Sequence, residues 1–79
     1  MIEITTNKII KLSENIEVNS PLVTVIQASD NYKSKSVSVT VKFTGTGYSI
    51  ASEIGSFTYD ITWSDEDVLN HVTNFVNNN

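Results

Sequence analysis

The sequence predicts an α+β fold: a small twisted antiparallel β-sheet of four to six strands in a meander, with one C-terminal amphipathic helix packed on one face. Two segments, residues 36–44 and 56–63, alternate apolar and polar residues as half-buried strands do. Residues 65–77 instead repeat apolar residues with the period of an amphipathic helix. A chain of 79 residues has room for a single domain, 1–79, built as one layer of sheet under one helix.

The first third of the chain predicts short strands. Ile2–Thr5 and Lys8–Leu12 are expected to be strands, because isoleucines flank a polar two-residue break. Ile16 and Val18 alternate with polar residues and indicate a loop or a short edge strand. Leu22–Ser29 is nearly all apolar and rich in β-branched residues, which is typical of a central strand with both faces partly covered.

The segment Lys35–Thr44 is expected to pair with Leu22–Ser29 as an antiparallel hairpin. One side of this strand belongs to the core, with Val37, Val39, Val41 and Phe43. The other side carries Ser36, Ser38, Thr40 and Lys42. Gly45–Gly47 marks a tight reversal, because glycine reaches positive φ without steric cost.

After the reversal the sequence predicts two strands rather than one. Tyr48 and Ile50 form a short strand that residues 52–55 interrupt. The next strand turns one set of residues to the core and another set away from it. The core set is Phe57, Tyr59, Ile61 and Trp63, and the opposite set is Thr58, Asp60 and Thr62. The three aromatic rings are expected to dominate core packing.

The C-terminal helix has a readable start and register. Ser64 is the expected N-cap, and three carboxylates follow in the first turn, where they interact favourably with the helix dipole. A single apolar stripe is expected to face the sheet, formed by Val68, Leu69, Val72, Phe75 and Val76. The outer side of the helix is expected to hold Asn70, His71, Thr73 and Asn74.

Composition argues against several classes of protein. The net charge is −4, with five lysines and no arginine, so counterion release would contribute little and we expect no nucleic-acid binding. The absence of cysteine excludes disulfides and thiolate metal sites. The first ten residues resemble neither a signal peptide nor a membrane anchor, so we expect no membrane association and a cytoplasmic or intravirion location.

No motif points to catalysis. Asp67 and His71 are one helical turn apart, which fits a solvated ion pair better than a catalytic dyad. Three successive acids, 65–67, diverge on a helix and do not converge on a metal ion. Residues 45–48 lack the lysine and the helix of a phosphate-binding loop. Trp63 and its neighbouring rings lack the cations of a nucleic-acid stacking platform. We therefore predict no catalytic residues, no metal, no cofactor, no small-molecule substrate and no enzymatic activity.

The hydroxyl-rich side of the sheet is the candidate interaction face. Its predicted members are Ser36, Ser38, Thr40, Lys42, Thr58, Asp60 and Thr62. One helix of thirteen residues covers only one side of a small sheet, so this side meets water or a partner. The early strands carry lysines and the late segment carries acids, which favours self-association as a homo-oligomer. An exposed edge of a neighbouring strand, offered for β-augmentation, would extend this docking surface. An ordinary solvated face is the alternative.

These observations predict a small non-enzymatic interaction or structural protein. The Asn-, Ile-, Lys- and Ser-rich composition without arginine is typical of a low-GC bacterium or its phage, which suggests a virion, tail or assembly component. The alternative is a small acidic inhibitor that binds a host protein in an anti-defence role, its acidic C-terminal half imitating nucleic-acid charge.

Overall fold

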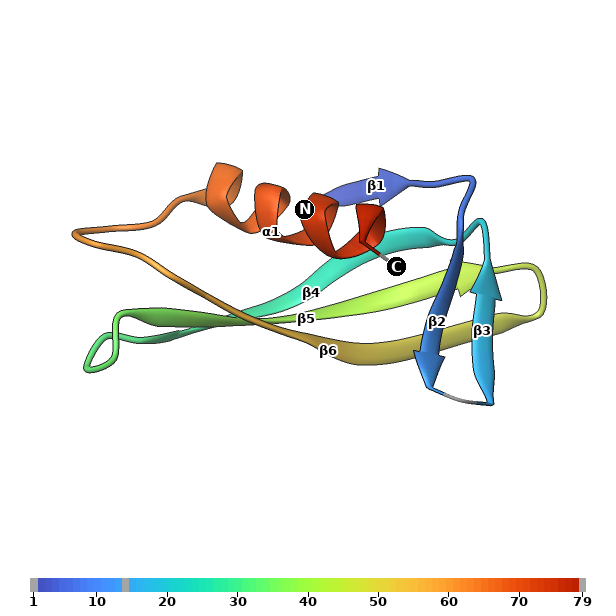
Figure 1. The fold of residues 1–79 in the computed structure, drawn as a ribbon, viewed down its shortest axis with the longest axis horizontal. Helices are drawn as coiled ribbons and strands as arrows, with labels where there is room; N and C mark the ends of the chain where they lie inside the picture. Colours follow the sequence, from blue (N-terminus) through green and yellow to red (C-terminus); the bar gives the residue numbers. More distant parts are fainter. Residues whose placement is uncertain (1, 14, 79) are drawn as a thin grey trace.

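The computed structural model describes residues 2–13 and 15–78, which form antiparallel strands in two sheets and a C-terminal helix (Figure 1). This architecture confirms the predicted α+β fold class. The elements are β1 (Glu3–Thr5), β2 (Ile9–Ser13), β3 (Ile16–Asn19), β4 (Leu22–Asn31), β5 (Ser36–Gly45), β6 (Tyr48–Thr58) and α1 (Asp65–Asn77). Within the described ranges, α1 is too short and too polar to cross a membrane, and no other helix qualifies.

The main sheet has the strand order β1-β4-β5-β6. Strands β4, β5 and β6 form the predicted meander of consecutive hairpins, with Leu22 opposite Thr44 and Thr44 opposite Ser49. Strand β1 joins the other edge of β4, where Glu3 lies opposite Thr24. The segment around Ile16, predicted as a loop or an edge strand, is β3, which pairs with β2 in a separate two-stranded sheet.

Strand β6 is continuous, so the predicted interruption at residues 52–55 is wrong. Ile54 and Gly55 together lie opposite Val39, because the register shifts by one residue between Ser38 and Thr40 of β5. Gly55 has a φ of 88°, a conformation that glycine adopts without a Cβ clash. The glycine therefore marks a bulge within one long strand rather than the end of a strand.

The chain leaves the sheet earlier than predicted. Strand β5 begins at Ser36, which pairs with Thr58, and the last ladder bond runs from the Tyr59 N–H to the Lys35 carbonyl oxygen at 2.9 Å. Beyond that point β6 has no neighbour to pair with. Ile61, predicted to lie in the core, is 88% exposed as a result.

One side of the main sheet, hereafter the inner face, holds the core. The buried apolar residues are Ile10, Val18, Val23, Val37, Val39, Val41, Phe43, Ile54, Val68, Val72 and Val76. Helix α1 contributes every fourth residue from Val68 to Val76, and the ring of Phe75 lies 6.3 Å from that of Phe43. The helical stripe is thus confirmed, with Leu69 at its rim and 37% exposed.

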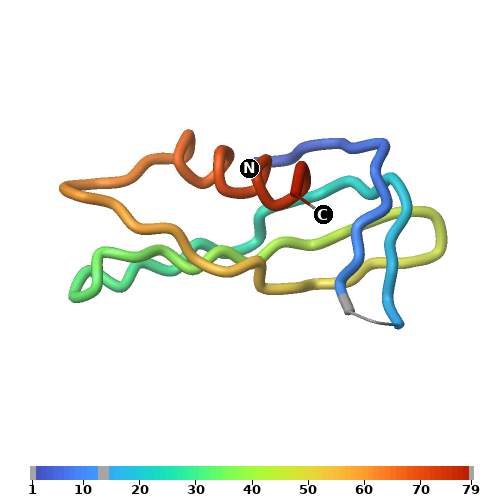
Figure 2. The backbone as a smooth tube through the Cα atoms, viewed as in Figure 1, coloured from blue at the N-terminus to red at the C-terminus, as the bar shows by residue number. Residues whose placement is uncertain are grey.

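The β2–β3 hairpin covers the inner face beyond the end of α1 (Figures 1 and 2). Ile10 and Val18 of this hairpin are buried in the common core. The Tyr48 hydroxyl donates to the Asn19 carbonyl oxygen at 3.3 Å, and Lys8 Nζ donates to the carbonyl oxygen of Asn77 at 2.8 Å. These bonds join β6 to β3, and the residue before β2 to the end of α1, so helix and hairpin share one side of the sheet.

The helix begins as the sequence predicts. Ser64 is the N-cap residue, and its N–H donates to Asp67 Oδ2 at 2.9 Å. This is the reciprocal bond of a capping box, with aspartate in the place that glutamate usually takes. Asp67 is therefore engaged in starting the helix.

Candidate functional site

The side of β4, β5 and β6 opposite the core, hereafter the outer face, is the candidate site. Side chains of paired residues lie on the same side of a sheet, so the register gives its composition. Its cross-strand rows are Leu22–Thr44–Ser49, Thr24–Lys42–Ala51, Gln27–Thr40–Glu53, Ser29–Ser38–Ser56 and Asn31–Ser36–Thr58. Hydroxyl and amide side chains fill most of these positions, and Lys42 and Glu53 are the charged members of the rows.

Five of the seven residues predicted for this face are brought together by the strands, Lys42 among them. The five are Ser36, Ser38, Thr40, Lys42 and Thr58. Asp60 and Thr62 lie outside any strand, in the segment that connects β6 to α1. Their predicted placement on the sheet is wrong because β5 offers no partner strand beyond Thr58.

Most of the residues that β4 and β6 contribute to the outer face were missed in the sequence analysis. Gln27, Ser29 and Asn31 of β4, with Glu53 and Ser56 of β6, complete the rows. Two bulges shift the alternation by one residue in the middle of β4 and of β6, so a search for unbroken alternation does not find these residues. The signal that could have found Ser56 is the glycine before it.

The outer face is accessible but not uniformly exposed. Ser36, Ser38 and Thr40 are half-buried because β5 is the central strand and side chains of both neighbours flank them. The Ser34 and Ser36 hydroxyls lie 2.8 Å apart, and the Thr24 hydroxyl donates to Glu3 Oε2 at 3.3 Å. Such hydroxyls both donate and accept hydrogen bonds, so this face can pair with polar groups of either kind.

Charges of both signs lie close together on this face. Lys42 occupies the row next to that of Glu53, which makes the two residues diagonal neighbours on adjacent strands. Glu3 of β1 extends the row of Lys42 beyond Thr24. Lys42 on β5 thus lies between Glu3 on β1 and Glu53 on β6.

His71 does not lie on the outer side of the helix, as predicted, but against β6. It is half-buried, with Nε2 3.2 Å from the Ile54 carbonyl oxygen and its ring 5.6 Å from that of Phe57. His71 lies three residues after Val68 and four before Phe75, at the edge of the apolar stripe, and this spacing was the available signal. The Asp67 carboxylate contacts Ser64 and the His71 ring contacts β6, so the two side chains have separate partners.

Trp63 has the packing role that the sequence favoured. Trp63 packs edge-on against Phe57 with ring centroids 6.3 Å apart, as part of the partly buried layer around the core. Among the residues that the structure describes, no group of three or more His, Asp or Glu side chains is arranged to hold a metal ion. What the outer face offers chemically is hydrogen bonding and neighbouring charges of both signs.

Comparisons with family models, with curated proteins and with solved structures find no match for this chain.

Proposed function

We propose that this chain is a non-enzymatic interaction protein whose outer face associates with the outer face of a second copy. The observation that supports the proposal is the unequal covering of the sheet. Helix α1 and the β2–β3 hairpin both lie on the inner face, and no described element lies over the rows of Ser36, Ser38 and Thr40. The polar residues there keep their hydrogen-bonding capacity for water or a partner.

The charge pattern favours a second copy as the partner. A two-fold axis through the outer face brings Lys42 of one protomer toward Glu53 of the other, and the reverse pair forms by symmetry. One charge of each sign per copy is enough for such a reciprocal contact. Salt is expected to weaken it, because these groups are exposed.

The size of the face indicates weak association. Three strands of about ten residues offer about 500 Å² of flat surface per copy, at ~4.8 Å between strands and ~3.3 Å per residue. Stable complexes bury about 800 Å² per partner. We therefore propose a concentration-dependent assembly, which suits a component present in many copies. The arginine-free, low-GC-like composition supports a phage particle as its setting.

Light scattering from about 1 µM to about 1 mM, in low and high salt, tests the proposal. We expect the mean mass to rise with concentration and Thr40→Lys, in the middle of the face, to weaken association at least about tenfold by adding like charge. Thr58→Lys, at the end of the face, is expected to act less strongly. Asn74→Lys, on the exposed side of α1, is the matched control and should have no effect. A monomer at every concentration would refute the proposal.

The second candidate is an acidic inhibitor of a host protein. The exposed carboxylates of Asp60, Asp65 and Glu66 between β6 and the first turn of α1 favour it. Changing all three to their amides is expected to abolish capture of a basic host protein and to leave self-association unchanged. The two candidates are thus separable, because these acids lie outside the rows of the outer face.

A further inference from the structure

One edge of the main sheet is only half covered. Strand β1 pairs with residues 22–24 of β4. One more backbone hydrogen bond follows, from the Val25 N–H to the carbonyl oxygen of Ile2, the residue before β1, at 2.9 Å. No described strand lies beside residues 26–31. The side chains of Ala28 and Val25 lie on the inner face. Residues of one strand whose side chains share a face direct their backbone N–H and C=O groups to the same edge of the strand. Ala28 and Asp30 therefore present free N–H and C=O groups to a strand that would continue β1.

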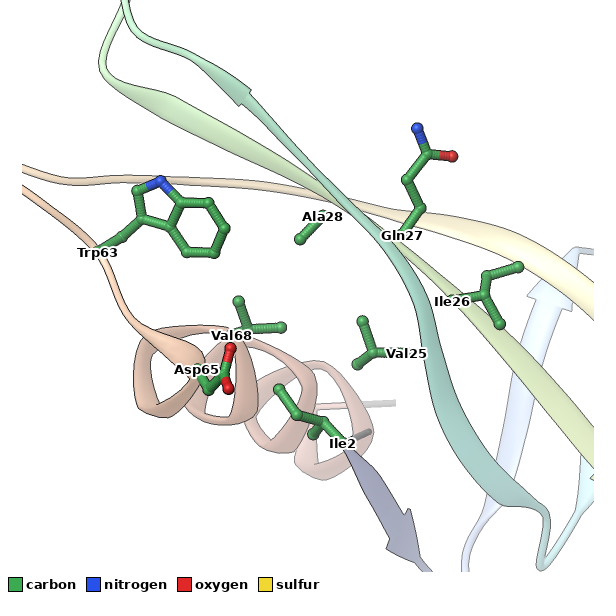
Figure 3. A pocket seen from close by; sticks show the side chains of 8 residues that line it. All are labelled: Ile2, Val25, Ile26, Gln27, Ala28, Trp63, Asp65 and Val68. Atoms are coloured by element: carbon green, nitrogen blue, oxygen red, sulfur yellow. The ribbon is translucent and has the colours of Figure 1, made fainter.

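A cleft of about 260 Å³ opens beside this free edge (Figure 3). Trp63 closes one end, Ile2 lies at the other, and Val68 of α1 faces β4 across it. The full lining is Ile2, Val25, Ile26, Gln27, Ala28, Trp63, Asp65 and Val68. The volume is below the ~300–1,000 Å³ of pockets for drug-sized molecules, and it suits one or two side chains.

We propose that this edge and cleft bind an extended segment of a partner protein by strand addition to β4. The segment runs antiparallel to β4 and in line with β1. One bulky aliphatic side chain enters the cleft between Ala28 and Val68, and a lysine or arginine two residues away, on the same face of the added strand, meets Asp65. Backbone bonds supply affinity and the alternate side chains supply specificity.

Charge identifies the partner as basic. Asp65 is the one ionisable residue among the described lining residues, and the exposed Glu66 follows it. Asp30, two residues beyond Ala28 on the same face, places a further exposed carboxylate along the edge. A second copy would bring its own Asp30 to the same edge, and like charges in close contact disfavour that pairing.

The single tryptophan of the sequence lies at the cleft and reports on binding. The probe is a blocked heptapeptide, Thr-Lys-Thr-Leu-Thr-Lys-Thr, whose Leu and Lys residues share one face of a strand. We expect saturable change in Trp63 fluorescence with a Kd on the order of 100 µM. No saturation up to millimolar peptide would overturn the proposal.

Two control peptides separate strand addition from simple apolar or charge attraction. N-methylation of the central Leu removes a backbone donor and keeps the side chain that enters the cleft, so binding should fall by more than tenfold. Glutamate in place of both lysines should have a similar effect, because it faces Asp65. If the backbone-modified peptide bound as tightly as the original peptide, backbone pairing would be overturned. If the glutamate peptide did so, charge recognition would be overturned.

Protein variants place the site on the molecule. Asp65→Asn is expected to weaken binding about threefold to tenfold, whereas Glu17→Gln, an exposed carboxylate on β3, should leave it unchanged. Ala28→Leu should fill the cleft and abolish binding. If that variant does not fold, hydrogen exchange of the wild-type protein decides, with protection of the Ala28 and Asp30 amides expected on binding.

This site is independent of the outer face. Thr40→Lys, expected to break self-association, should bind the peptide as the wild-type protein does. Protection of amides along β6 in place of Ala28 and Asp30 would overturn the edge proposal and leave the proposed self-association in force.

Discussion

The two sides of strand β5 differ in burial although they share one backbone. Val37, Val39, Val41 and Phe43 are 0% exposed on the inner face. On the outer face Ser36, Ser38 and Thr40 are half-buried and Lys42 is exposed. From this difference we expect the inner residues to hold the fold and the outer residues to tolerate change with little cost in stability, which would leave them available for binding.

The largest expected effect is at the centre of the inner face. Phe43→Ala should lower the free energy of unfolding by about 3–5 kcal/mol, because it removes a fully buried ring and leaves a cavity. That loss is comparable to the total stability of a small domain. Thermal and urea melts measure it, with Lys42→Ala, the next residue along β5, as the control. Similar losses of unfolding free energy for Phe43→Ala and Lys42→Ala would contradict the proposed difference between the two faces.

The helix allows the same comparison at its own surface. Phe75 is only partly buried, so Phe75→Ala should cost about 2–3 kcal/mol, less than Phe43→Ala, by loss of contact area with the Phe43 ring. The neighbouring Asn74→Ala should cost almost nothing, since Asn74 is exposed. Melts followed by circular dichroism compare the two, and equal stabilities would show that the assigned helix register is wrong.

Gly55 controls which residues of β6 face inward. A Cβ at this position would have no atom within 4 Å beyond its own chain neighbours, so the cost of Gly55→Ala comes from its φ of 88° alone. We expect a loss of about 1–2 kcal/mol in chemical denaturation, the usual penalty for a Cβ in left-handed backbone. Ser56→Ala on the outer face is the control, and an unchanged midpoint for Gly55→Ala would mean that the bulge relaxes freely.

The smallest expected effect concerns Tyr59. Its hydroxyl donates to Asp30 Oδ1 at 2.7 Å, and this bond, followed by desolvation and by the Asp30 charge, raises the pKa of Tyr59 above 10.0. The folded state therefore holds the phenol proton more tightly than the unfolded state does. The stability from this bond is present below pH 10 and is lost as the pH rises through the raised pKa.

Melts between about pH 9 and about pH 11.5 test this pH dependence. Tyr59→Phe should flatten the part of the decline that comes from this bond, whereas Tyr32→Phe, whose ring is 73% exposed, should not. A decline that is identical in the wild-type protein and Tyr59→Phe would contradict the assignment.

The elements with one unbroken period were predictable from the sequence. The stripe from Val68 to Val76 and the alternation from Val37 to Phe43 each belong to a single regular element, so pattern alone identifies them. Four residues of the outer face, Ser36, Ser38, Thr40 and Lys42, followed from this alternation, and Thr58 followed from that of residues 56–63. Pattern alone could not reveal that the central strand would leave three of them half-buried, because that depends on strand order.

The wrong predictions concern residues where a regular sequence pattern is interrupted or ends. In β6 the inward residues are even-numbered up to Ile54 and odd-numbered from Phe57, because the bulge at Gly55 adds one residue. In the sequence, a one-residue shift of the apolar–polar alternation within a strand looks the same as the end of one strand and the start of another. The exposed Ile61 and the half-buried His71 were misplaced because only tertiary neighbours decide whether a residue at an element's margin is covered.

The strand order also bears on the sequence of folding events. Strands β4, β5 and β6 are joined by short turns, so their pairing closes only small loops, and six residues separate β6 from α1. The pairing of Glu3 with Thr24 instead requires the intervening hairpin to be in place, and its loop-closure entropy is larger. We expect the meander and helix to form the folding nucleus and β1 to dock late. Residues 22–24 of β4, which pair with β1, would then be the last part of the sheet edge to be shielded during folding, and no described strand shields residues 26–31.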